Sequence, residues 1–182
     1  MKGRIMILGM SMATFVTVDV IISLIAIVAG LVVMFGMLGS NRMPGLTAIF
    51  LLFTILTSAT GFVIPPLVSE TLLPSHLFGI LSLILLAIAC IALYAMKLTG
   101  AWRWIYVVTA LLALYLNVFV LVTQSFLKIP ALTALAPGNP PAGPVFAVAQ
   151  GIVLVFFVLM IIGAWRRFRP VGDGLSVSLR GA

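Results

Sequence analysis

The chain has 182 residues, of which 64% are hydrophobic and only 7% are charged. A water-soluble domain carries about 25% charged residues, so this composition excludes a soluble fold and makes the lipid bilayer the solvent. The net charge of +7 does not indicate a nucleic-acid-binding protein, because the basic residues lie in short junctions and at the chain ends rather than along one face. The single cysteine, Cys90, excludes an internal disulfide and a CxxC redox pair.

Five apolar segments are each long enough to cross about 30 Å of hydrocarbon as a helix. They lie at about residues 12–38, 46–65, 76–96, 104–126 and 145–165. The turns GSNRMPG and KLTGAWR are short and contain helix breakers, which favours two antiparallel hairpins built from the first four segments. The sequence therefore predicts an all-α fold, an integral membrane bundle of five transmembrane helices. This single domain would cover residues 1–169, followed by a short cytoplasmic tail at 170–182.

The N-terminal segment and the connection before the fifth segment each carry a further signal. Lys2 and Arg4 give the N-terminus a basic start, but no small-x-small cleavage site follows and Asp19 interrupts the apolar run. We therefore expect this segment to be retained rather than removed as a signal peptide. The connection before the fifth segment, LKIPALTALAPGNPPAGP, holds five prolines and is predicted to be stiff and extended in places. Two interpretations stay open for it, a cap over the bundle mouth and a spacer.

Lysine and arginine counts predict the orientation in the membrane. With five spans, seven basic residues fall on the side of the C-terminus and three on the other side. The seven are Arg42, Lys97, Arg103, Arg166, Arg167, Arg169 and Arg180, and the three are Lys2, Arg4 and Lys128. This bias predicts a cytoplasmic C-terminus and an outside N-terminus, although Lys2 and Arg4 oppose it.

The stretch YLNVFVLVTQSF places two amides, Asn117 and Gln124, in a segment otherwise suited to lipid. An amide in hydrocarbon needs a partner, because leaving it unpaired costs several kcal/mol, roughly. Helical spacing puts both amides on one stripe with small residues, which is typical of a face that packs against other helices. The stripe consists of Tyr106, Ala110, Ala113, Asn117, Leu121, Gln124 and Lys128. We expect it to face the bundle interior.

Polar side chains of all five segments gather at one end of the predicted bundle, the end assigned to the outside. Six of them are candidates for ligand binding or ion coupling: Asp19, His76, Asn117, Gln124, Gln150 and Lys128. Thr57, Ser58 and Thr60 fall in the same half of the second segment.

Asp19 is the deepest acid in the chain, and an ionisable residue within a span usually faces a partner or water. Its predicted partners are Lys128 and His76. One interpretation is a polar pocket in which Asp19 and His76 handle protons. The other is an ion pair that fixes the order of the helices, with the three amides acting as contacts between helices.

Several kinds of chemistry have no support in the sequence. One histidine cannot provide bis-histidine haem ligation, and three acidic residues leave no room for a carboxylate metal centre. HExxH, Walker and GxGxxG motifs do not occur, and no serine has a histidine and an acid at a recognisable spacing. We therefore expect no catalytic residue, no metal and no cofactor, and an enzyme is the less favoured class.

The stretch LYLNVFVLVTQSFLKIPALTALAP resembles a recurring pattern in uncharacterised small multi-pass membrane proteins of proteobacterial type. The resemblance extends from about Gly61 to Trp165. It implies a bacterial inner (plasma) membrane location and no particular activity. The hairpin pattern also resembles four-helix haem-binding membrane families, but the paired histidines of those families are missing here.

Three functional hypotheses follow. The first is a non-enzymatic accessory component of a membrane complex, in which the outer polar pocket binds a lipidic or quinone-like ligand or a membrane-protein partner. The second is a homo-oligomeric, proton-coupled small transporter or channel that uses Asp19. The third is a redox-associated membrane subunit that uses His76 with Asp19. In each case the lipid bilayer is the surrounding medium, and nucleic acid is not a partner.

Overall fold

The computed structural model describes residues 6–7, 10–63 and 74–170. Five long helices in this part of the chain are apolar enough to cross a membrane. They are α1 (Met12–Leu38), α2 (Pro44–Val63), α3 (Pro74–Cys90), α4 (Trp102–Lys128) and α6 (Pro144–Arg167). The predicted all-α bundle is therefore confirmed, and the chain is that of a multi-pass membrane protein.

Four short elements accompany these helices. Strands β1 (Met6–Ile7) and β2 (Met10–Ser11) pair in antiparallel fashion just before α1. A π-helical segment, η2 (Ile91–Ala95), continues α3, and the short helix α5 (Pro130–Leu135) follows α4. The proline-rich connection is therefore partly helical, where the sequence predicted an extended loop. Pro130 stands in the first turn of α5, where its fixed φ suits a helix and its missing N–H is not needed.

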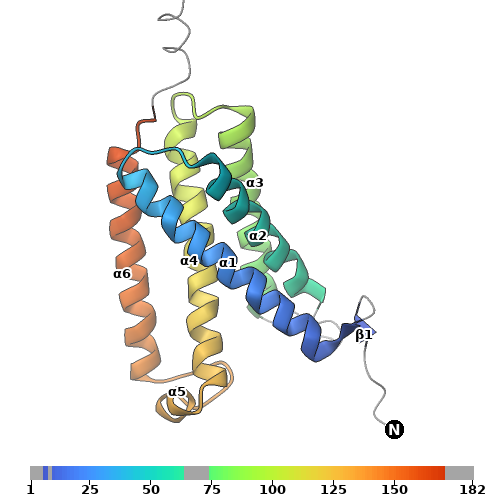
Figure 1. The fold of residues 1–182 in the computed structure, drawn as a ribbon. Helices are drawn as coiled ribbons and strands as arrows, with labels where there is room; N and C mark the ends of the chain where they lie inside the picture. The colour runs from blue at the N-terminus through green and yellow to red at the C-terminus, as the bar shows by residue number, and fades with distance from the viewer. Residues whose placement is uncertain (1–5, 8–9, 64–73, 171–182) are drawn as a thin grey trace, which may run out of the picture.

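The first four helices form two antiparallel hairpins, α1 with α2 and α3 with α4, as the short turns predicted. Figure 1 shows α6 running alongside α4 and α1 crossing the bundle obliquely. The C-terminal end of α1 lies near α6, whereas its N-terminal end lies beside α2 and away from both α4 and α6. Consequently α1 and α4 are close in one half of the bundle and diverge in the other half.

Gly30 marks the place where α1 comes closest to its neighbours. A Cβ atom built on Gly30 would lie 2.6 Å from Cδ1 of Leu114 in α4 and 2.8 Å from Cδ2 of Phe50 in α2. Both neighbours are fully buried, so neither has free space to move into. Only a residue without a side chain lets three helix backbones approach this closely, as small residues do in membrane bundles.

The apolar core occupies one half of the bundle. Its members come from the C-terminal halves of α1, α3 and α6 and the N-terminal halves of α2 and α4. The largest fully buried side chains are Tyr106, Phe50, Met34, Met37, Leu86, Leu111, Leu114 and Val107, together with Thr54. Antiparallel connections bring these half-helices to the same end. The other half of the bundle is packed less tightly, and it holds most of the polar side chains.

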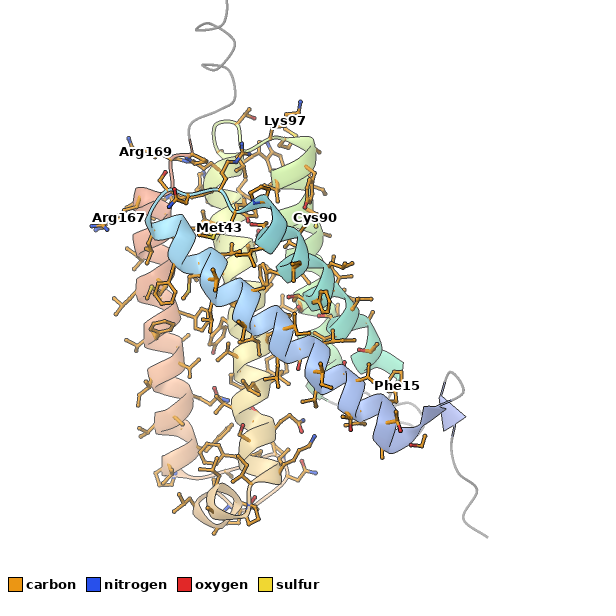
Figure 2. The ribbon with its side chains drawn as sticks, viewed as in Figure 1. Phe15, Met43, Cys90, Lys97, Arg167 and Arg169 are labelled. Atoms are coloured by element: carbon orange, nitrogen blue, oxygen red, sulfur yellow. The ribbon has the colours of Figure 1, made fainter. Side chains whose placement is uncertain are left out.

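We name the two ends by their charges. The basic end carries Lys97, Arg167 and Arg169, which Figure 2 shows together at one end of the bundle. The polar end is the opposite one, where α1 begins near Phe15 and where α4 passes into α5.

Candidate functional site

A cavity of about 550 Å³ lies in the polar half of the bundle, and we call it the polar cavity. Residues of α1, α2, α3 and α4 line it, and half of them are polar. Its polar lining consists of Asp19, Ser23, Thr57, Ser58, Ser82, Asn117, Gln124, Ser125 and Lys128. Ligand pockets in proteins measure about 300–1,000 Å³, so the volume suits a small molecule or part of a lipid.

Asp19 reaches the cavity from α1 and is held by hydroxyl groups of α2. Thr57 Oγ1 donates a hydrogen bond of 3.0 Å to Asp19 Oδ1, and Thr60 Oγ1 donates a second to the same oxygen. Thr57 and Thr60 are three residues apart, so they share a helix face. The sequence had named Lys128 and His76 as partners. No ion pair links the described side chains of Asp19 and Lys128, because α1 packs along α2 and diverges from α4, whose last residue is Lys128. The side chain of His76 is not among the described ones, so its pairing with Asp19 stays a prediction.

Two further polar contacts cross between helices next to the cavity. Ser58 of α2 and Ser82 of α3 are buried, and their hydroxyl oxygens are 3.1 Å apart. Asn117 Nδ2 of α4 donates to Thr54 Oγ1 of α2 over 3.4 Å. An amide side chain can make up to four hydrogen bonds, so one long bond leaves most of the capacity of Asn117 available to a ligand.

The predicted stripe on α4 has two different halves. Tyr106, Ala110 and Ala113 are fully buried in the core, as a face directed to the bundle interior requires. Further along, Gln124 and Lys128 are exposed and line the polar cavity. The stripe thus changes from a packing surface into a cavity wall at about Asn117, the first of its residues that lines the polar cavity.

Gln150 lies outside the polar cavity, on the side where α6 packs against α4. Its Nε2 donates to the carbonyl oxygen of Phe119 at 3.1 Å and to Thr123 Oγ1 at 3.2 Å. The side chain is 9% exposed, and its Oε1 is buried without a hydrogen-bond partner among the described residues. This geometry is that of a contact between two helices.

Some of the predicted features fall outside what the structure describes. The backbone of His76 belongs to the first turn of α3, but its side chain is not among the described ones. Residues 1–5, 64–73 and 171–182, which include Lys2, Arg4 and the predicted cytoplasmic tail, also lie outside. Among the described residues, no group of three or more His, Cys, Asp or Glu side chains could hold a metal ion.

Sequence reasoning missed part of the site. Thr54 is fully buried and accepts the bond from Asn117, yet one threonine in an apolar helix carries no signal of its own. Phe78 and Gly79 line the α3 side of the cavity, and the Phe78 ring stacks on Phe119 with centroids 5.1 Å apart. These positions follow from how α3 is rotated against α4, which the apolar pattern alone does not determine.

No protein-family model matches this chain, and no curated protein or solved structure matches it either. The fold therefore defines the class, a multi-pass membrane protein with a half-polar cavity, and the function is inferred from the geometry of that cavity.

Proposed function

We propose that this protein is a non-enzymatic membrane component that binds a lipidic amphiphile in the polar cavity. A phospholipid or a quinone would have the required combination of polar head and apolar chain. Binding of this kind fits an accessory protein of a membrane complex. The observation that carries the proposal is the position of the cavity, which lies within the depth of the bilayer and is bounded by helices that diverge there.

The cavity reaches far into the apolar region. It extends along α4 from Lys128 to Leu116, twelve residues or about 18 Å. This distance exceeds half of the roughly 30 Å of hydrocarbon that a bilayer contains. An occupant at this depth must be compatible with lipid, which favours an amphiphile over a water-soluble metabolite.

We infer that the cavity also opens sideways between α1 and α4. Val20 of α1 and Val120 of α4 both line it, and each is 39% exposed. Val120 lies eight residues before the end of α4, about 12 Å along the helix, so this opening is at the depth of the acyl chains. A lipid could therefore reach the cavity directly from the bilayer.

The polar lining supports recognition of the head of the ligand. The carboxyl group of Asp19 and the amides of Asn117 and Gln124 offer acceptors and donors to one volume, and Lys128 adds a cation at the mouth. The carboxyl group of Asp19 suits a part of the head group that has hydrogen-bond donors, and the cation of Lys128 suits an anionic part. A few converging polar groups in an otherwise apolar pocket are the usual basis of orientation and specificity.

Native mass spectrometry of the whole chain in mild detergent tests this proposal. We expect the wild type to retain a lipid or quinone, or to bind added phosphatidylethanolamine or a short-chain quinone. Asn117→Leu and Gln124→Leu should lose the adduct. Gln150→Leu is the matched control, because it removes a membrane-embedded amide outside the cavity and should keep the adduct. A wild type that binds neither probe, or a control that loses binding equally, would refute the proposal.

A second candidate is a homo-oligomeric transporter or channel in which Asp19 takes up and releases a proton. The observation in its favour is that Asp19 faces the polar cavity and is the one acidic side chain among the described residues. Reconstitution in vesicles separates the two candidates. Transport requires an oligomer and a pH-dependent flux that Asp19→Asn abolishes, whereas ligand binding without flux supports the first proposal.

We infer from the basic residues that the basic end faces the cytoplasm. That the membrane is a bacterial inner membrane is proposed from the resemblance of LYLNVFVLVTQSFLKIPALTALAP to proteobacterial membrane proteins. Six of the seven described basic side chains belong to the basic end, and Lys128 belongs to the other end. Labelling with a membrane-impermeant thiol reagent tests this orientation in a Cys90→Ser background. Lys97→Cys should be protected in intact cells and Gly138→Cys should react, and the reverse pattern would invert the orientation.

A further inference from the structure

A second cavity, of about 420 Å³, lies at the opposite end of the molecule, and we call it the basic-end cavity. It is bordered by the C-terminal part of α1, the turn into α2 and the start of α2, and by η2 and the turn that follows it. The first part of α4 and the residue after α6 complete the lining. Its lining consists of Val33, Met37, Asn41, Arg42, Met43, Pro44, Thr47, Leu93, Tyr94, Leu98, Tyr106 and Phe168. Neither functional candidate described above uses it.

Every polar side chain of this cavity can donate a hydrogen bond, and the only charged one is a cation. Arg42 and Asn41 are exposed in the turn between α1 and α2, and Tyr94 of η2 is 60% exposed. A guanidinium group presents several N–H donors in a planar fork that matches a phosphate. Within the part of the chain that the structure describes, no acidic side chain lies at this end to neutralise Arg42.

The surroundings strengthen the positive potential. Lys97, Arg103, Arg166, Arg167 and Arg169 lie at the same end as Arg42. Figure 2 shows Lys97, Arg167 and Arg169 around the end at which Met43 also lies. Basic pockets between transmembrane helices at this level of a membrane are typical sites for anionic lipid head groups.

The backbone around the cavity is unusual in three places. Ser40, Lys97 and Leu98 are the non-glycine residues with positive φ in the described ranges, at 58°, 49° and 59°. All three lie in the two turns that border the cavity, and Leu98 lines it. At Ser40 the positive φ belongs to the C-terminal cap of α1, in which the N–H of Ser40 donates to Met37 O at 3.0 Å and the N–H of Asn41 donates to Gly36 O at 2.9 Å.

The segment after α6 closes the inner side of the cavity. The backbone N–H of Arg169 donates to Ser40 Oγ at 2.8 Å, which ties this segment to the turn between α1 and α2. Phe168 is consequently buried, and its ring lies 6.2 Å from that of Tyr106. The cavity thus combines a buried apolar wall with exposed polar and cationic side chains.

We propose that the basic-end cavity binds the phosphate group of an anionic phospholipid, with Arg42 as the main contact and Asn41 and Tyr94 as further donors. The apolar side chains of the interior contact the glycerol and the first part of the acyl chains. A lipid fits better than free phosphate, because the cavity lies at the level of the helix ends and most of its lining is apolar.

Lipid titration followed by native mass spectrometry of the whole chain tests this site. The probes are phosphatidylglycerol, phosphatidylcholine with the same acyl chains, and excess inorganic phosphate as a competitor. Arg42→Gln should weaken the tightest binding of phosphatidylglycerol at least about tenfold, the order expected for a charge-assisted hydrogen bond. Tyr94→Phe should weaken it by a smaller factor.

Arg167→Gln is the matched control, because it removes the same charge from an exposed side chain that does not line the cavity. We expect Arg167→Gln to weaken the binding of phosphatidylglycerol less than about twofold, since salt largely screens an exposed charge that makes no contact in the cavity. Equal losses in Arg42→Gln and Arg167→Gln would overturn the site in favour of diffuse attraction. Equal binding of the two lipids would overturn it as well, and displacement by inorganic phosphate would assign the site to free phosphate. A thermal unfolding scan of each variant establishes that it is folded.

Discussion

Gly30→Ala should destabilise the bundle, because this position is where α1, α2 and α4 come closest together. The new Cβ atom would lie 2.6 Å from Leu114 Cδ1 and within 2.9 Å of two atoms of the Phe50 ring. These distances are far below van der Waals contact. Leu114 and Phe50 are 0% and 1% exposed, so relief requires that the helices separate or that buried side chains leave their preferred rotamers.

Two opposing terms set the size of the effect. Overpacking a well-filled core costs about 1–3 kcal/mol. Replacing glycine by alanine within a helix contributes about 0.5–1 kcal/mol in the opposite direction. The middle values of these two ranges differ by about 1 kcal/mol, which is the expected loss in the free energy of unfolding.

Unfolding of the protein in mixed micelles by increasing fractions of sodium dodecyl sulfate, followed by circular dichroism, measures this loss. Gly151→Ala is the matched control, since a Cβ atom at Gly151 of α6 would meet nothing within 4 Å. The control should be neutral or slightly stabilising. If Gly30→Ala proved as stable as the wild type, the three helices would not be in close contact at this glycine, and the reasoning would fail.

Three further predictions concern polar contacts between helices and use the same unfolding assay. Asp19→Asn should change stability little, because an amide oxygen still accepts both threonine hydrogen bonds, whereas Asp19→Leu should cost about 0.6–2 kcal/mol; equal effects of the two variants would contradict these bonds. Gln150→Leu should shift stability by less than about 1 kcal/mol, since two lost bonds are offset by removing a buried oxygen without a partner; a larger loss would mean that this oxygen has a partner in the membrane. A double-mutant cycle of Ser58→Ala and Ser82→Ala should give a coupling of about 0.6–1.7 kcal/mol, and a coupling of zero would exclude the hydrogen bond between α2 and α3.

Much of the fold could be predicted from the sequence, because hydrocarbon thickness and helix breakers constrain a membrane protein strongly. The predicted first span, 12–38, coincides with α1, and the described ends of the other long helices lie within about two residues of their predicted bounds, except where η2 replaces the last turns of α3. The predicted end of the second span, at residue 65, lies outside the described residues. Nothing in the residues 91–95 marks the π-helical geometry of η2.

For the polar residues, the sequence predicts their level in the bundle but not their contacts. Their common level in the bundle follows from helix rise alone, so Asp19, Asn117 and Gln124 could be assigned to one end from their positions in the chain. Which side chains then meet depends on the tilt and rotation of each helix. That is why Asp19 contacts threonines of α2, and why Gln150 contacts α4 outside the cavity. The basic-end cavity could not be predicted from the sequence, because an arginine in a turn, such as Arg42, is already explained as a determinant of membrane orientation.

Because α1 crosses the bundle obliquely and is packed closely at Gly30, a change of its tilt about Gly30 moves its N-terminal half. Asp19 is eleven residues away from that contact, or about 16 Å, so a 10° change of tilt moves it by about 3 Å. With 27 residues, α1 is about 40 Å long, which exceeds the roughly 30 Å of hydrocarbon, and an oblique course accommodates the excess length. Helix tilt adjusts to bilayer thickness. We therefore expect a change of bilayer thickness to move the N-terminal half of α1, and with it the α1 side of the polar cavity, more than the packed basic half.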